Sequence, residues 1–322
     1  MGASPMHRRL PLLVGVAATA VAAQACTLAE VTLVEAADAV VAEVYVQVSP
    51  GDPGAARAIA WLHRTMDGKE AVLGRPVPGA DVLITSARGF SLELAETSIE
   101  TCVSGMGMEG TGTCYATSAE LAARLLPGDE LTLEVALPGG GLLRGTSVVP
   151  GDFRLLGNAA TGVCSVEALS PLEVRWTRSA GAWAYVNETA IHGLRAALEP
   201  QGIVVEKDPL YLLGLSISAA DTTIVFPGEF GVFDRFDLDQ GVALALQKGL
   251  PPNTWATVAI TAADRNYVNW GRGGNFNPSG LVKVPSLRGD GTGVFATTVT
   301  RSFRLGAAAT GVIPQALPCE GG

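Results

Sequence analysis

Apolar and polar residues alternate in many short segments of the chain after residue 40. Residues 43–48 (EVYVQV) place three valines between three polar or amphipathic residues. A period of two is typical of a strand with one face buried. Alternation, or a run of β-branched residues, also predicts strands at 80–85, 90–94, 130–135, 142–149, 172–176, 182–186, 215–218, 222–226, 255–261 and 294–305. Segments 56–65 and 238–249 fit a helix or a strand equally well.

Turn residues separate these segments, in a chain with 39 glycines and 19 prolines. The clearest case is PGGG at 138–141, which joins 130–135 to 142–149 and predicts a hairpin. Short strands at close spacing with such turns predict an all-β fold built from β-sandwiches.

The length of 322 residues favours two domains. Pro150-Gly-Asp152 offers a boundary, and residues 155–162 resemble a linker. We therefore expect one β-sandwich domain at 26–152 and a second at 153–322. In the second, the aromatic-bearing segments 172–176 and 182–186 resemble early strands of an immunoglobulin-like or fibronectin-III-like sandwich.

The first 25 residues have the pattern of an export signal. Arg8 and Arg9 precede a charge-free, mostly apolar run, which ends in Ala23-Gln24-Ala25-Cys26. Small residues before a cysteine resemble a lipobox, which predicts a signal peptide at 1–25 and an acylated Cys26. The alternative is an ordinary secretory signal whose cleavage site happens to precede a cysteine. The apolar run is shorter than the ~20 residues of a membrane-spanning helix.

The charge disfavours nucleic acid as a partner. The net charge is −9, and removal of residues 1–25 takes away Arg8 and Arg9 and no acidic residue, which leaves −11. An acidic surface repels phosphate backbones and anionic lipid head groups. The hydrophobic content of 48% is ample for folded cores.

Four cysteines remain if Cys26 carries lipid, and an exported chain can pair four cysteines in three ways. Cys102 and Cys114 flank a Gly-rich loop, so closing that loop is the pairing with the smallest entropic demand, and it contributes ~3 kcal/mol. Cys164 would then pair with Cys319. The sequence has no Cys-x-x-Cys motif, and neither His63 nor His192 has a cysteine beside it. We therefore expect no metal and no other cofactor.

One segment has the composition of a ligand-binding loop. Residues 266–277 (NYVNWGRGGNFN) combine the aromatic Tyr267, Trp270 and Phe276 with Arg272 and amides, which could hold a sugar or a peptide. The alternative, which we favour, is that Tyr267 and Trp270, three residues apart, pack one turn of helix onto the sandwich.

Other candidate sites are weaker. Three carboxylates at 234–239 lack the spacing of an EF-hand, so we favour a solvated acidic turn. The GDGTG at 289–293 lacks the Gly-Lys ending of a phosphate loop. No Gly-x-Ser-x-Gly motif is present. The sequence therefore predicts a protein that is not an enzyme; a hydrolase with an unrecognised site is a third class that we consider.

Four segments together suggest a family resemblance: RPVPGADVLI at 75–84, LPGDELTLEV at 126–135, GTSVVP at 145–150 and RGDGTGVF at 288–295. After a lipobox cysteine, they resemble the domain-of-unknown-function 4249 lipoproteins of Gram-negative bacteria. Ala296, where that family has Gly, and the Cys102–Cys114 insert depart from the pattern. The resemblance supplies no catalytic residues.

The resemblance implies an outer-membrane lipoprotein, often encoded near TonB-dependent transporters. We therefore expect a non-enzymatic binding or accessory module, lipid-anchored on the periplasmic or cell-surface face, with a transporter as partner. The alternative is a surface protein that binds carbohydrate or peptide through 266–277.

Overall fold

The structure, a computed structural model, describes residues 38–65, 75–103, 111–216, 218–228, 240–275, 283–308 and 316–319. The predicted signal peptide, Cys26, Phe276 and the acidic segment 234–239 lie outside these residues. No helix in the described part of the chain is long and apolar enough to cross a membrane.

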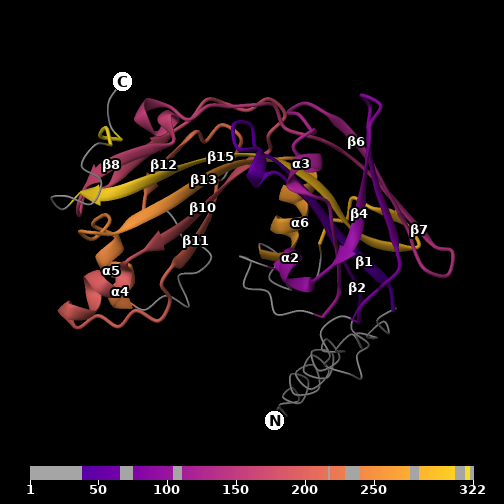
Figure 1. Ribbon diagram of the computed structural model, residues 1–322, viewed down its shortest axis with the longest axis horizontal. Helices are drawn as coiled ribbons and strands as arrows, with labels where there is room; N and C mark the ends of the chain where they lie inside the picture. The colour runs from indigo at the N-terminus through magenta and orange to yellow at the C-terminus, as the bar shows by residue number, and fades with distance from the viewer. Residues whose placement is uncertain are drawn as a thin grey trace, which may run out of the picture. The chain divides into compact units, whose positions relative to one another are not determined.

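Strands predominate among the described elements (Figure 1). The strands are β1 Val40–Val48, β2 Arg57–Arg64, β3 Asp81–Ser86, β4 Ser91–Thr97, β5 Thr113–Ala116, β6 Glu130–Ala136, β7 Leu142–Val148, β8 Val163–Glu167, β9 Leu172–Arg175, β10 Ala184–His192, β11 Leu210–Leu215, β12 Thr223–Phe226, β13 Trp255–Ala263, β14 Arg288–Gly289 and β15 Gly291–Ala308. The helices are α2 Ile99–Val103, α3 Ala119–Ala122, α4 Leu194–Leu198, α5 Gln240–Leu246 and α6 Arg265–Asn275, with 3-10 turns η2 Pro53–Ala55, η3 Gly157–Thr161 and η4 Glu199–Gln201.

Thirteen strands form one mixed sheet, in the order β11-β10-β13-β15-β1-β2-β5-β4-β3-β6-β7-β14, with β8 also paired to β15. A separate two-stranded sheet joins β9 to β12. The expected pair of β-sandwich domains is therefore wrong. The reason is the 18-residue β15, which pairs with β1 on one edge and with β13 on the other. Strands from both predicted domains thus share backbone hydrogen bonds in one sheet.

Most strands lie where alternation predicted them, but their partners differ. The hairpin of β6 and β7 is confirmed. Segment 56–65 contains strand β2, and 238–249 contains helix α5. The strand expected at 215–218 is wrong, because β11 covers Leu210–Leu215 and ends where that strand would begin. The aromatic-bearing β9 and β10 do not pair with each other, because β9 pairs with β12 and β10 with β11 and β13. The immunoglobulin-like arrangement is therefore absent from this part of the described chain.

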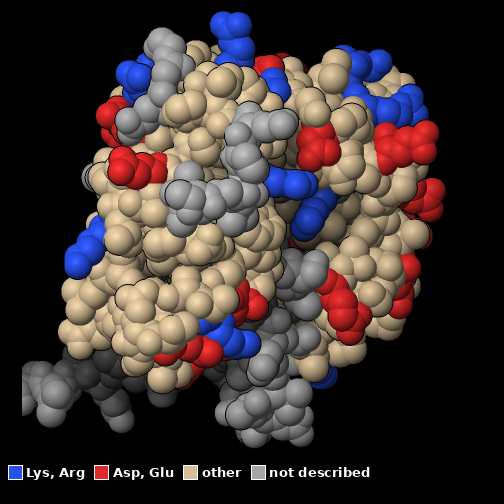
Figure 2. Space-filling view, turned by 60° about the vertical axis from the view of Figure 1, so that its left-hand side comes forward, with Lys and Arg blue, Asp and Glu red and all other residues tan. Residues whose placement is uncertain are grey.

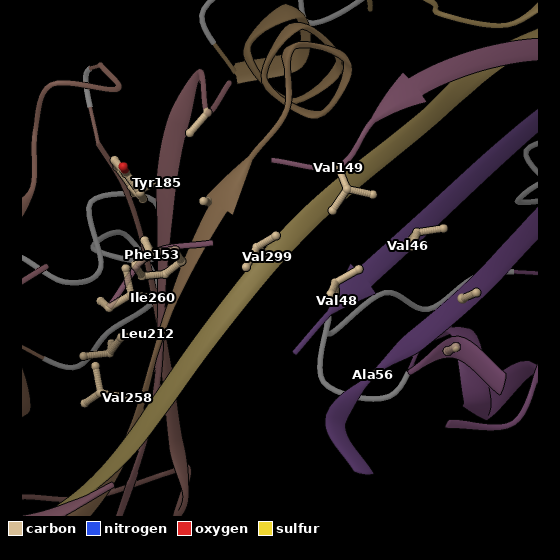
Figure 3. Packing of buried hydrophobic residues seen from close by; sticks show 14 of the residues in the cluster. Val46, Val48, Ala56, Val149, Phe153, Tyr185, Leu212, Val258, Ile260 and Val299 are labelled. Atoms are coloured by element: carbon tan, nitrogen blue, oxygen red, sulfur yellow. The ribbon is translucent and has the colours of Figure 1, made fainter. Parts of the chain in front are cut away.

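Alternate residues of β1 face opposite sides of the sheet. Val44, Val46 and Val48 enter the main apolar core, and Figure 3 shows Val46 in one cluster with Val299 of β15 and Ile260 of β13. Leu212 of β11 belongs to the same cluster. We call this the core face. The opposite side of the sheet carries α6 in its middle part, and we call it the α6 face.

Candidate functional site

Segment 266–277 was a candidate binding loop, with packing of a helical turn as the favoured alternative, and it is helical up to Asn275 as part of α6. Trp270 is 7% exposed and packs on Val41, Val294 and Ala296 of the α6 face. Tyr267 is half-buried against the same cluster. The structure thus favours packing rather than ligand stacking for these two rings. The side chain of Arg272, like Phe276, lies outside the described residues.

The helix covers a buried carboxylate, Glu43 of β1, which is 7% exposed. Tyr45 donates its hydroxyl to Glu43 at 2.8 Å, and Trp270 donates its indole N–H at 3.2 Å. The Lys283 ammonium lies 3.5 Å from the same carboxylate, and the His63 Nε2 lies 3.9 Å away. We call these five residues the Glu43 cluster.

The Glu43 cluster compensates the cost of burying a charge. Burial alone would raise the pKa of Glu43, but the His63 ring, the Lys283 charge and the hydrogen bonds from Tyr45 and Trp270 outweigh it and lower that pKa to about 2. Glu43 therefore stays ionised and links β1 to α6. This role could not be predicted from the sequence, because a glutamate in an alternating strand is expected to face water.

A second buried carboxylate, Asp264, lies just before α6 and caps its first turn. Its Oδ1 accepts the backbone N–H of Tyr267 at 2.7 Å, and its Oδ2 accepts the Ser147 hydroxyl at 2.5 Å. Thr297 lies 2.7 Å from the Ser147 oxygen. This group therefore connects β7, β15 and α6. Burial raises the pKa of Asp264 to about 6, against the opposing effect of these hydrogen bonds.

The raised pKa of Asp264 predicts that stability falls between pH 4 and pH 6. The folded state holds this proton up to about pH 6, whereas an unfolded aspartate loses it near pH 3.8. Stability from this group is therefore complete at low pH and declines as the pH rises through about 6, by about 3 kcal/mol in total. Urea unfolding of wild type and Asp264→Asn at pH 4.5 and pH 7 measures the difference.

The substituted protein cannot ionise at position 264, so its free energy of unfolding should lose this part of the pH dependence. Other titrating groups act in both proteins and cancel in the comparison. The same pH dependence in both proteins would contradict the assignment.

A cavity lined partly by polar residues lies beside β15, where the pairing of the sheet is interrupted. On one edge of β15, β1 pairs as far as Val299 and β8 begins pairing at Arg304. Between these two points the described strands leave that edge uncovered, and a cavity of about 920 Å³ opens there. We call it the β15 cavity. Its lining comprises Ser49, Pro50, Gly51, Asp52, Ala55, Arg154, Leu155, Ala159, Ala160, Thr161, Gly162, Val163, Thr257, Thr300, Arg301, Ser302, Phe303 and Arg304.

Arg301 fixes the wall of the β15 cavity. Its guanidinium donates to both oxygens of Asp152, at 2.7 and 2.9 Å, and to the carbonyls of Pro50 and Phe153, at 2.6 and 3.1 Å. These bonds join the loop after β1 to the segment before η3. Gly51 permits the approach: its φ is +90°, and a Cβ there would lie 3.2 Å from Arg301 Nη1. The cavity is therefore formed before any ligand arrives.

The β15 cavity was missed in the sequence because its parts are distant along the chain. Residues 155–162 resembled a linker, yet Leu155 is buried in the core and bridges to Trp176, and Ala159 is buried as well. Figure 2 shows charged groups scattered over a mostly uncharged surface.

Two disulfides are present, Cys102–Cys114 and Cys164–Cys319, with Cα separations of 5.8 and 4.9 Å. Both pairs were expected, because closure of the short loop joins Cys102 to Cys114 and leaves Cys164 to pair with Cys319. Cys102 lies in α2 and Cys114 in β5, whereas Cys164 in β8 is joined to a residue near the end of the chain.

Comparison with known proteins gives little. No family model matches the chain, and no curated protein matches it. A solved structure of a DUF4785 family protein from Legionella pneumophila subsp. pneumophila str. Philadelphia 1 is 14% identical; the match covers 68% of this chain and 51% of that protein, with a TM-score of 0.19. This chain thus spans about half the length of that protein. The resemblance to the 4249 lipoproteins stays a prediction.

Proposed function

We propose that this protein is a non-enzymatic binding module of the bacterial cell envelope, held to the outer membrane by lipid on Cys26. The observation that carries the binding function is the β15 cavity. Its volume of about 920 Å³ lies within the range of small-molecule sites, roughly 300–1,000 Å³. The hydrogen bonds of Arg301 hold the backbone of its wall in place, which limits how much of the site a ligand has to order.

The histidines of the described structure make contacts elsewhere in the fold. His63 belongs to the Glu43 cluster, and the ring of His192 stacks on Trp255 at 3.8 Å between centroids. Neither histidine is among the residues that line the β15 cavity.

A ligand screen with a matched cavity variant tests the binding function. Ala160 is exposed and lines the β15 cavity, so that Ala160→Trp places a large ring in it without disturbing the core. Compounds that raise the melting temperature of wild type should fail to do so for Ala160→Trp. Equal shifts in both proteins, or no shift from any compound of a broad envelope-metabolite panel, would contradict binding at this cavity.

The envelope location is supported by the two disulfides, which persist in oxidising compartments. Two or more acyl chains on Cys26 would anchor the protein stably, because each buried methylene contributes ~0.8 kcal/mol. The Cys26→Ala variant should move from the membrane to the soluble fraction on cell fractionation. Retention of that variant in membranes would contradict the lipid anchor. Co-purification with an outer-membrane transporter tests the accessory role.

A further inference from the structure

We infer that the β15 cavity binds a small oxyanion, a molecule that carries carboxylate or phosphate groups. This inference rests on the proposed binding function and names the ligand class. It is argued from the two arginines at the cavity, Arg154 and Arg304, whose charges no described carboxylate pairs.

Arg154 and Arg304 are both exposed and line the cavity from different segments. The described structure contains no ion pair or side-chain hydrogen bond of either guanidinium. An arginine presents five N–H donors in a planar fork that matches a carboxylate or phosphate. Two such forks at one cavity favour an anion that accepts from both.

The backbone holds both arginines in place. The N–H of Arg154 donates to the Thr177 hydroxyl at 2.9 Å, and its carbonyl accepts the N–H of Thr177 at 2.9 Å. The N–H of Arg304 donates to the carbonyl of Gly162 at 2.9 Å, where β15 begins to pair with β8. Only the side chains remain to be ordered by a ligand, which limits the entropic cost of binding.

The uncovered edge of β15 adds neutral donors. Backbone groups along a strand alternate between its two edges, so that the N–H of Ser302 points to the same edge as that of Arg304. No described strand lies opposite Ser302 on that edge. Its N–H and hydroxyl, with the hydroxyl of Thr257 on the cavity lining, can donate to ligand oxygens.

The charges at the cavity sum in favour of an anion. Arg301 is neutralised by Asp152 from behind, and Asp52 is the single carboxylate of the lining. Arg154 and Arg304 therefore leave one net positive charge at a cavity in a chain of net charge −9. Because such attraction is screened by salt, affinity for an anion should fall as ionic strength rises.

Titration calorimetry tests the inference on the exported protein purified in detergent. The probes are citrate, inorganic phosphate and, as a neutral probe, glucose, each against wild type, Arg154→Gln, Arg304→Gln and Ala160→Trp. Arg288→Gln is the matched control, because Arg288 is exposed on β14 and is not part of the cavity lining. We expect citrate or phosphate to bind wild type and the control equally, and about tenfold or more weakly after either cavity substitution.

Two results would overturn the inference. One is the absence of citrate and phosphate binding at millimolar concentration, and the other is binding that neither cavity substitution weakens. Glucose binding that Ala160→Trp abolishes would refute the anion class and leave the binding function standing. If no compound of the screening panel distinguishes wild type from Ala160→Trp, the binding function itself is refuted.

Discussion

Replacing both Cys164 and Cys319 with serine is expected to lower the free energy of unfolding by about 5 kcal/mol. The disulfide joins residues 155 apart, and restriction of the unfolded chain grows with the logarithm of that separation. Both cysteines are buried, and the strand segment around Cys164 also bonds to the C-terminal residues: the N–H of Ser165 donates to the carbonyl of Leu317 at 2.8 Å. Without the covalent link, the C-terminal segment can leave β8.

The matched control is the double substitution of Cys102 and Cys114, which are 12 residues apart. The same chain-entropy argument gives about 3 kcal/mol for that pair. Urea unfolding of both variants and wild type, without reductant, measures the two losses. A loss for the long-range pair equal to or smaller than that for the local pair would contradict the argument.

What the sequence could predict was local. Alternation in β1, β4 and β6 depends only on which residues face the core, so that these strands were found without knowledge of their partners. The disulfide pairs followed from the short loop between Cys102 and Cys114. Both kinds of evidence lie within a few residues of the feature that they predict.

What the sequence could not predict was pairing between distant segments. β15 pairs with β1 in parallel and with β13 in antiparallel register, and nothing in its β-branched run selects these partners. The division into two sandwiches failed for that reason. The β15 cavity has the same origin, because it exists only where β1 ends and β8 begins along one edge of β15.

Helix α6 shows how tertiary contacts override local composition. Its segment contains three glycines, at 271, 273 and 274, each of which costs up to about 1 kcal/mol in a helix, so that composition alone disfavours the three turns that form. Asp264 caps the first turn, and Trp270 is buried on the sheet. These two contacts stabilise a helix that propensity alone would not form.

Replacing Trp270 with alanine is therefore expected to lower the free energy of unfolding by about 3–5 kcal/mol. The substitution removes a ring packed on Val41, Val294 and Ala296. It also takes from Glu43 the indole hydrogen bond at 3.2 Å and leaves that buried carboxylate with one donor fewer.

The control for Trp270→Ala is Trp183→Ala. Trp183 is 47% exposed, and its described ring contact is the Arg265 guanidinium at 5.1 Å from its centroid. An exposed cation–π contact contributes about 0.5–1 kcal/mol, so that this variant should lose far less stability. Urea unfolding of both variants gives the comparison. Equal losses would contradict the packing of Trp270. If Trp270→Ala keeps its stability but binds ligand more weakly, α6 would be the binding site, because a ring that does not stabilise the fold is free to contact a ligand.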